Sequence, residues 1–216
     1  ASGALSSTSL WVDYIYLDTD ERRRFAQVSH EYLIEQLQFT GEESVSSTSK
    51  TATLNFNHPV KELVWVAQAD KNITNGEFNN YSTVANGYKE NDDGRRHENY
   101  YTTDANANLN PVSAAKLQLN GHDRFAERNG DYFNYVQPYQ HHSRTPGAGI
   151  NVYSFALNPE EHQPSGTCNF SRIDNASLQL TLRTTAGYQG RKLRVYAVNY
   201  NVLRIMSGMG GLAYSN

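Results

Sequence analysis

The alternation of apolar and polar residues along the chain predicts mainly β-strands. Runs in which apolar and polar residues alternate, as in strands with one buried face, are 51–56 (TATLNF), 114–121 (AAKLQLNG), 176–182 (ASLQLTL) and 193–205 (LRVYAVNYNVLRI). Runs that are apolar on both faces are 11–17 (WVDYIYL), 62–68 (ELVWVAQ) and 150–157 (INVYSFAL). The run 30–39 (HEYLIEQLQF) is ambiguous, because Leu33 and Leu37 fit a helix as well as a strand.

Seven or eight strands and one long polar stretch predict an all-β, antiparallel sandwich of two sheets, of which the eight-stranded jelly roll is one form. The residues expected in the core between the sheets are Leu54, Phe56, Leu63, Trp65, Leu117, Leu119, Leu178, Leu180 and Leu182. The polar stretch 69–112 is rich in Asn, Gly and Tyr. We expect it to form a loop insertion at one outer end of the domain that adds no strand to either sheet.

Local signals predict the other elements. Asp18 and Glu21 have the spacing of a capping box, and acidic residues precede arginines, so a short helix is expected over 18–27. Asn120-Gly121 predicts a tight turn after the strand at 114–119. A helical turn is expected within 129–142, ended by Pro138.

Composition narrows the classes of function. The chain has 216 residues, 38% hydrophobic and 19% charged, which is typical of a globular domain. A net charge of −3 gives no reason to expect a nucleic-acid-binding surface. The single cysteine, Cys168, excludes an intrachain disulfide, and we interpret it as a small buried residue rather than a nucleophile. No apolar run is long enough to span a membrane, and the first ten residues do not resemble a signal peptide.

The candidate chemistry is sparse. The glycines of SGMGG, 207–211, are followed only by LAYSN, so the helix that a phosphate loop needs cannot form, and we expect a flexible or closely packed tail. The adjacent His141 and His142 would point to opposite faces of a strand, which does not favour a metal site. We therefore expect no catalytic residues, no metal and no cofactor.

Four Asn-x-Ser/Thr sequons are possible glycosylation sites or plain asparagines: Asn72, Asn80, Asn169 and Asn175. The first two lie in the polar insertion, where a glycan would be tolerated. Asn175 enters a strand, where modification is less favoured.

Several long stretches resemble the major capsid proteins of the nucleocytoplasmic large DNA viruses, and most closely those of algal viruses. They are 10–39, 54–65, 116–140, 152–178 and 196–216, together well over half of the chain. The resemblance implies two jelly rolls in tandem, of which this chain carries the second. It also implies that 30–39 is a strand.

By the family pattern, residues 1–17 are the end of the first jelly roll, with 11–17 as its last strand. Residues 18–29 are the inter-domain connection with its short helix, and 30–216 are the C-terminal jelly roll. The resemblance further implies a structural role in the virion capsid shell, assembled in the host cytoplasm. The implied partners are copies of the chain in trimeric, pseudo-hexagonal capsomers, neighbouring capsomers and minor capsid proteins, with no direct nucleic-acid binding and a membrane only beneath the capsid.

The tail is the expected assembly contact. Its large apolar side chains, Met206, Met209, Leu212 and Tyr214, would be buried against a neighbouring chain, so residues 206–216 would be ordered in the capsomer and mobile in an isolated subunit. The alternative function is a lectin-like module, in which the tyrosines and asparagines of 69–112 bind glycans.

Overall fold

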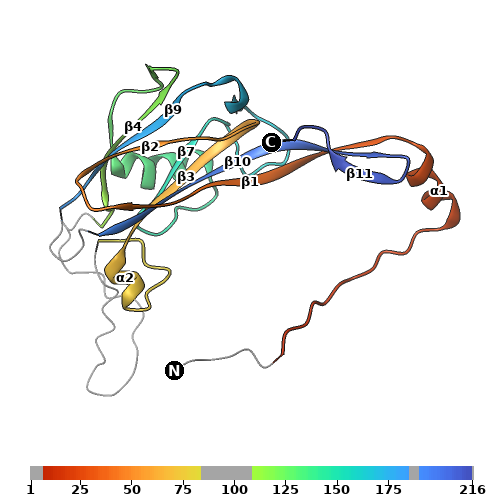
Figure 1. Cartoon of the computed structure of the whole chain (residues 1–216), viewed down its shortest axis with the longest axis horizontal. Helices are drawn as coiled ribbons and strands as arrows, with labels where there is room; N and C mark the ends of the chain where they lie inside the picture. Colours follow the sequence, from red (N-terminus) through yellow and green to blue (C-terminus); the bar gives the residue numbers. More distant parts are fainter. Residues whose placement is uncertain (1–6, 84–108, 185–189, 216) are drawn as a thin grey trace. The chain divides into compact units, whose positions relative to one another are not determined.

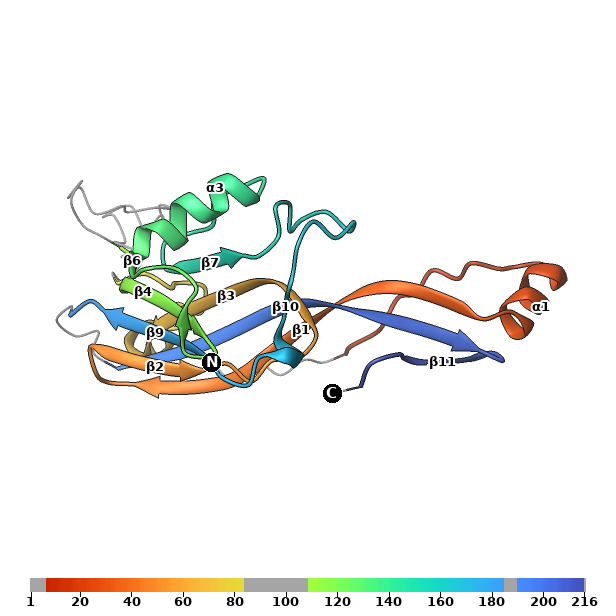
Figure 2. The ribbon, with the colours of Figure 1, turned by 90° about the horizontal axis from the view of Figure 1, so that it is seen from above.

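The computed structural model describes residues 7–83, 109–184 and 190–215. The chain divides into two compact units (Figures 1 and 2). The first unit combines the chain up to Leu33 with Val202–Ser215, and the second comprises Ile34–Asn201. Two long strands, β1 (His30–Val45) and β10 (Arg191–Met206), each contribute residues to both units.

Two β-sheets make up the sandwich. The first sheet has the order β1, β10, β3 (Pro59–Ala69) and β7 (Ile150–Ser154), with β8 (Cys168–Asn169) on β3 and β11 (Met209–Leu212) on β10. The second sheet has the order β2 (Ser49–Thr53), β9 (Ala176–Leu182), β4 (Val112–Leu119) and β5 (His122–Asp123), with β6 (Arg128–Asn129) on β4. β3 is antiparallel to β10 and β7, and β9 is antiparallel to β2 and β4.

The helices are short. They are α1 (Thr19–Gln27), α2 (Asp70–Thr74), a π-helix (Tyr132–Val136), α3 (Gln137–His141) and a 3₁₀ turn (Phe170–Arg172). The capping interaction expected at α1 is present, because the Asp18 side chain accepts a hydrogen bond from the Glu21 N–H at 2.9 Å.

The core lies between the sheets, as the alternation of apolar and polar residues predicted. Eight of the nine residues expected there are buried, and Trp65 packs on Phe133 with ring centroids 5.1 Å apart. Leu119 is only partly buried, because it ends β4 just before the Asn120-Gly121 turn. That turn is confirmed, with positive φ at Asn120 (51°) and Gly121 (79°) and His122 paired with Leu119.

The structure settles most of the strand predictions. The ambiguous run 30–39 lies in β1, and 176–182 coincides with β9. The described residues contain eleven strands, and eight were expected. Three of the eleven, β5, β6 and β8, are pairings of only two residues, and these account for the difference.

One local prediction, that for Pro138, is wrong, and another stays open. Residues 11–17 form no strand in this structure, and Trp11 is 90% exposed. Their assignment as the last strand of a preceding jelly roll stays a prediction, because the strands that would pair with them belong to that jelly roll. Pro138 does not end a helical turn but lies in the first turn of α3, where its missing N–H costs no hydrogen bond.

The predicted bounds of the insertion, 69–112, overlap the neighbouring strands, because Ala69 is the last residue of β3 and Val112 is the first residue of β4. Its described residues otherwise add no strand and include α2. Residues 84–108 lie outside the described part of the chain, so the expected outer loop stays a prediction there.

Candidate assembly surface and the polar cluster at His142

The end of the chain forms a β-hairpin rather than the tail expected from SGMGG. β10 and β11 pair from Leu203 with Leu212 to Met206 with Met209, joined by a two-residue turn at Ser207 and Gly208. Both turn residues have positive φ, 52° and 77°, which is the backbone of a type I′ hairpin turn. The Ser-Gly pair was therefore a turn signal that the reading of SGMGG as a tail missed.

The four predicted assembly residues all lie on this hairpin segment and are largely exposed. Their exposed fractions are 52% for Met206, 74% for Met209, 48% for Leu212 and 62% for Tyr214. Large apolar side chains that face water on one short segment can mark an interaction surface. We call residues 202–215 the terminal hairpin.

A second apolar surface lies on β1, within the sandwich unit. Leu37 and Phe39 are exposed, and the Phe39 ring stacks on Tyr196 at 4.7 Å between centroids. The alternate residue Gln38 instead donates hydrogen bonds to the Asn57 carbonyl (2.6 Å) and to the buried Asn199 (3.0 Å). The sequence placed Leu37 and Phe39 on one face of a strand but gave no sign that this face is the exposed one.

The base of the insertion, residues 70–83, is held by buried amides. The Asn72 side chain is fully buried, and its Nδ2 donates hydrogen bonds to the carbonyls of Asn80 and Ser82, both at 3.1 Å. Gln68 Nε2 donates to the carbonyls of Phe78 (2.9 Å) and Asn80 (3.2 Å). These bonds attach the start of the insertion to the end of β3.

The sequons have the reverse of the expected accessibility. Asn72 and Asn80 are buried, and Asn80 Nδ2 donates a hydrogen bond to Glu77 at 2.7 Å, so a glycan at either position would require this base to open. Asn169 and Asn175 are exposed. Asn169 Oδ1 accepts a hydrogen bond from the Ser171 N–H at 3.1 Å and so caps the 3₁₀ turn. Glycosylation at any of the four stays untested.

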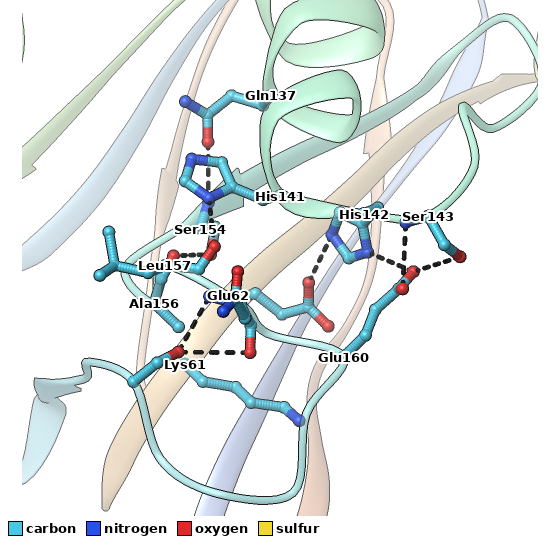
Figure 3. Close-up of polar contacts among 12 residues, drawn as sticks. Lys61, Glu62, Gln137, His141, His142, Ser143, Ser154, Ala156, Leu157 and Glu160 are labelled. Carbon is cyan, nitrogen blue, oxygen red and sulfur yellow. Dashed lines mark hydrogen bonds and ion pairs between the residues drawn. The ribbon is translucent and has the colours of Figure 1, made fainter.

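A polar cluster brings together three regions distant in sequence (Figure 3). His142 follows the last residue of α3, and its Nε2 lies 3.0 Å from Glu62 Oε2 on β3. Its Nδ1 lies 3.2 Å from Glu160 Oε1, and Glu160 also accepts hydrogen bonds from the Ser143 N–H and hydroxyl. Contact with Glu62 chiefly raises the pKa of His142, Glu160 adds to the rise, and partial burial opposes it.

This cluster does not have the chemistry of a metal or nucleophile site. Within 7–83, 109–184 and 190–215, no group of three His, Cys, Asp or Glu residues is placed to hold a metal. The two adjacent histidines diverge, since His141 Nδ1 contacts the Leu157 carbonyl at 2.9 Å.

The single cysteine is not activated as a nucleophile. Burial raises the pKa of the Cys168 thiol, which favours its unreactive protonated form. None of the helices in the described residues is long and apolar enough to cross a bilayer.

Comparison with known proteins gives consistent matches. The family model for the large eukaryotic DNA virus major capsid protein matches residues 21–211. The major capsid protein of Pyramimonas orientalis virus is 55% identical over all of this chain and 51% of its own length, and that of Phaeocystis pouchetii virus is 49% identical over 99% and 54%. The chain thus spans about half the length of the curated relatives it matches.

A solved structure described as the PBCV-1 virus capsid superimposes with a TM-score of 0.77 at 44% identity, covering 94% of this chain and 56% of that one. The two antiparallel sheets match this capsid fold, so the chain is a jelly-roll β-sandwich of the viral capsid class. It belongs to the family of large eukaryotic DNA virus major capsid proteins.

Proposed function

We propose that the chain is the C-terminal jelly roll of a major capsid protein and builds an icosahedral shell. Three copies form a capsomer of pseudo-hexagonal outline, and the partners are neighbouring capsomers and minor capsid proteins. The shell is assembled in the host cytoplasm, with no direct contact to nucleic acid and with a membrane only beneath it. Support comes from the family match and from the capsid fold.

The observation that carries the assembly proposal is the terminal hairpin. Its four large apolar side chains stay mostly exposed although their backbone is paired or adjacent to a paired strand. Burying one such side chain against another subunit contributes on the order of 1.5–3 kcal/mol. A neighbouring copy in a shell supplies the apolar surface that the single chain lacks.

A structural role needs no reaction, so we further propose that the chain is not an enzyme and requires no cofactor. The relatives are named as capsid proteins. The glycan-binding alternative is not favoured by the family match. Two asparagines of the insertion, Asn72 and Asn80, turn inward to bond the protein itself, whereas Asn75 and Asn79 are exposed.

The test is the mass of the species in solution, measured for the 216-residue chain and for a variant lacking 207–216. We expect a trimer for the full chain and a shift toward monomer for the truncated one. The matched control is Tyr139→Ser on α3, which removes another exposed aromatic side chain (83%) and should leave the mass unchanged. A truncated chain that stays as trimeric as the full one would contradict the role of the hairpin.

The tandem arrangement has its own test. The coding sequence on the 5′ side of Ala1 should encode a second set of alternating strands, because the matched relatives are about twice as long as the region they share with this chain. A flanking sequence without strand periodicity would contradict the tandem assignment while leaving the fold of this domain unaffected.

A further inference from the structure

The segment between β7 and β8 contains a closed loop, residues 157–165. Its ends meet, because the Leu157 N–H bonds the Ser165 carbonyl at 3.3 Å and the Asn158 N–H bonds the Ser165 hydroxyl at 2.9 Å. We call it the 157–165 loop. Being closed on itself, it can move as a unit when its contacts with the rest of the domain change.

Three histidines and Ser143 make the polar contacts that connect this loop to its surroundings (Figure 3 shows those of His141, His142 and Ser143). His141 Nδ1 contacts the Leu157 carbonyl at 2.9 Å. Glu160 binds His142 and Ser143, as described above. His162 Nδ1, on the loop itself, lies 3.9 Å from Glu35 Oε1 on β1.

Two of these contacts pair an imidazole with a carboxylate, and the His142 contact depends more on the ring charge, because His162 is 67% exposed and lies 3.9 Å from Glu35, where water screens the pair. His142 lies between two carboxylates, and its side chain and that of Glu62 are 17% and 12% exposed, so water screens the pair poorly. His141, by contrast, faces a neutral carbonyl, to which either a neutral or a charged ring can donate a hydrogen bond.

The nearest other cation on β3 is already paired. Lys61, next to Glu62 on β3, pairs with Glu35 at 2.7 Å and lies 5.4 Å from the centre of the Tyr200 ring on β10. Arg144 and Glu161 are the charged residues next in sequence to the cluster. The carboxylates that raise the pKa of His142 are those of Glu62 and Glu160.

We propose that His142 is a pH-dependent latch, whose protonated ring joins Glu62 on the sheet to Glu160 on the 157–165 loop. The folded-state pKa of His142 is raised, so the stabilisation is fully present below the unfolded value of 6.5 and is lost as pH rises through the folded value. Above that range the neutral ring carries a single N–H, so it can donate to only one of the two carboxylates and no longer joins Glu62 to Glu160.

Limited proteolysis of the 216-residue chain tests the latch. A glutamate-specific protease is applied from about pH 6 to about pH 8.5, and cleavage after Glu160 and Glu161 is normalised to a free peptide of the loop sequence. Normalised cleavage should rise at least about threefold in the unmodified chain as the latch opens. His142→Gln should be cleaved rapidly at every pH.

The matched control is His141→Gln, which weakens the same loop without removing the titrating group. Its cleavage should be faster throughout but keep the rise with pH. A normalised rate that is flat in the unmodified chain, or a rise that persists in His142→Gln, overturns the proposal.

Nuclear magnetic resonance titration gives a second readout, independent of loop opening. The pKa of the His142 ring should lie above 6.5 in the unmodified chain and fall toward that value in Glu62→Gln. An unchanged His142 pKa in Glu62→Gln would also overturn the proposal. Neither experiment depends on trimer formation, so the latch and the assembly role can fail separately.

Discussion

The terminal hairpin and the base of the insertion are both rich in small or polar residues, yet the hairpin exposes apolar side chains and the base buries polar ones. In the hairpin the apolar side chains of Met209 and Leu212 face outward. In the base the amide of Asn72 is fully buried. Polarity along the sequence therefore does not decide which side chains are buried in either region.

The difference follows from where the backbone finds its hydrogen bonds. In the hairpin, β11 pairs with β10, so its side chains are not needed for backbone bonding. In the base, the carbonyls of Phe78, Asn80 and Ser82 take no sheet partner and are satisfied by the side chains of Gln68 and Asn72. A buried irregular segment has to bury polar side chains, whereas an edge strand can leave apolar ones for a partner.

The largest effect is expected where the base meets the loop before β7. Gly149 has φ +90°, and a Cβ there would lie 2.0 Å from the Tyr81 carbonyl oxygen. Gly149→Ala should lower the free energy of unfolding by at least about 3 kcal/mol, measured by urea denaturation. Gly147→Ala is the matched control, because a Cβ at Gly147 meets nothing within 4 Å. Similar losses in both variants would show that the base is not tightly docked.

A smaller loss is expected from the buried amide itself. Asn72→Ala removes the donor to two buried carbonyls and should cost about 2 kcal/mol of folding free energy. Asn79→Ala, at an exposed position in the same segment, should change stability by less than about 0.5 kcal/mol. Equal effects would contradict the view that the base is held from inside.

Local and periodic signals were enough to predict much of this fold. The alternation at 176–182 gave β9 with its buried leucines, and Asp18 marked the start of α1 because a cap acts within one turn. The family resemblance added the strand assignment of 30–39, which periodicity left open.

Features that depend on distant partners could not be predicted in the same way. The burial of Asn72 depends on where the chain near Asn80 returns, and the outward face of β1 depends on Asn199 bonding Gln38 across 161 positions. The His142 cluster joins residues 62, 142 and 160, and adjacency of two histidines carries no sign of it. Residues 11–17 are apolar on both faces, as in a buried strand, but such a run says nothing about whether a partner strand is present.

The smallest effect on folding is expected in the hairpin, where the same substitution should act on assembly instead. Leu212 is 48% exposed and pairs only through its backbone with Leu203. Leu212→Ala should change the free energy of unfolding by less than about 0.5 kcal/mol. The buried Leu180→Ala, a matched control with a 2% exposed side chain, should cost about 2–5 kcal/mol.

If Leu212 is buried by a neighbouring copy, its substitution should weaken association by about tenfold or more, measured by sedimentation equilibrium. Unchanged association together with unchanged stability would leave the exposed leucine without a partner in the trimer and would place the subunit contact elsewhere, with the apolar face of β1 as the next surface to mutate.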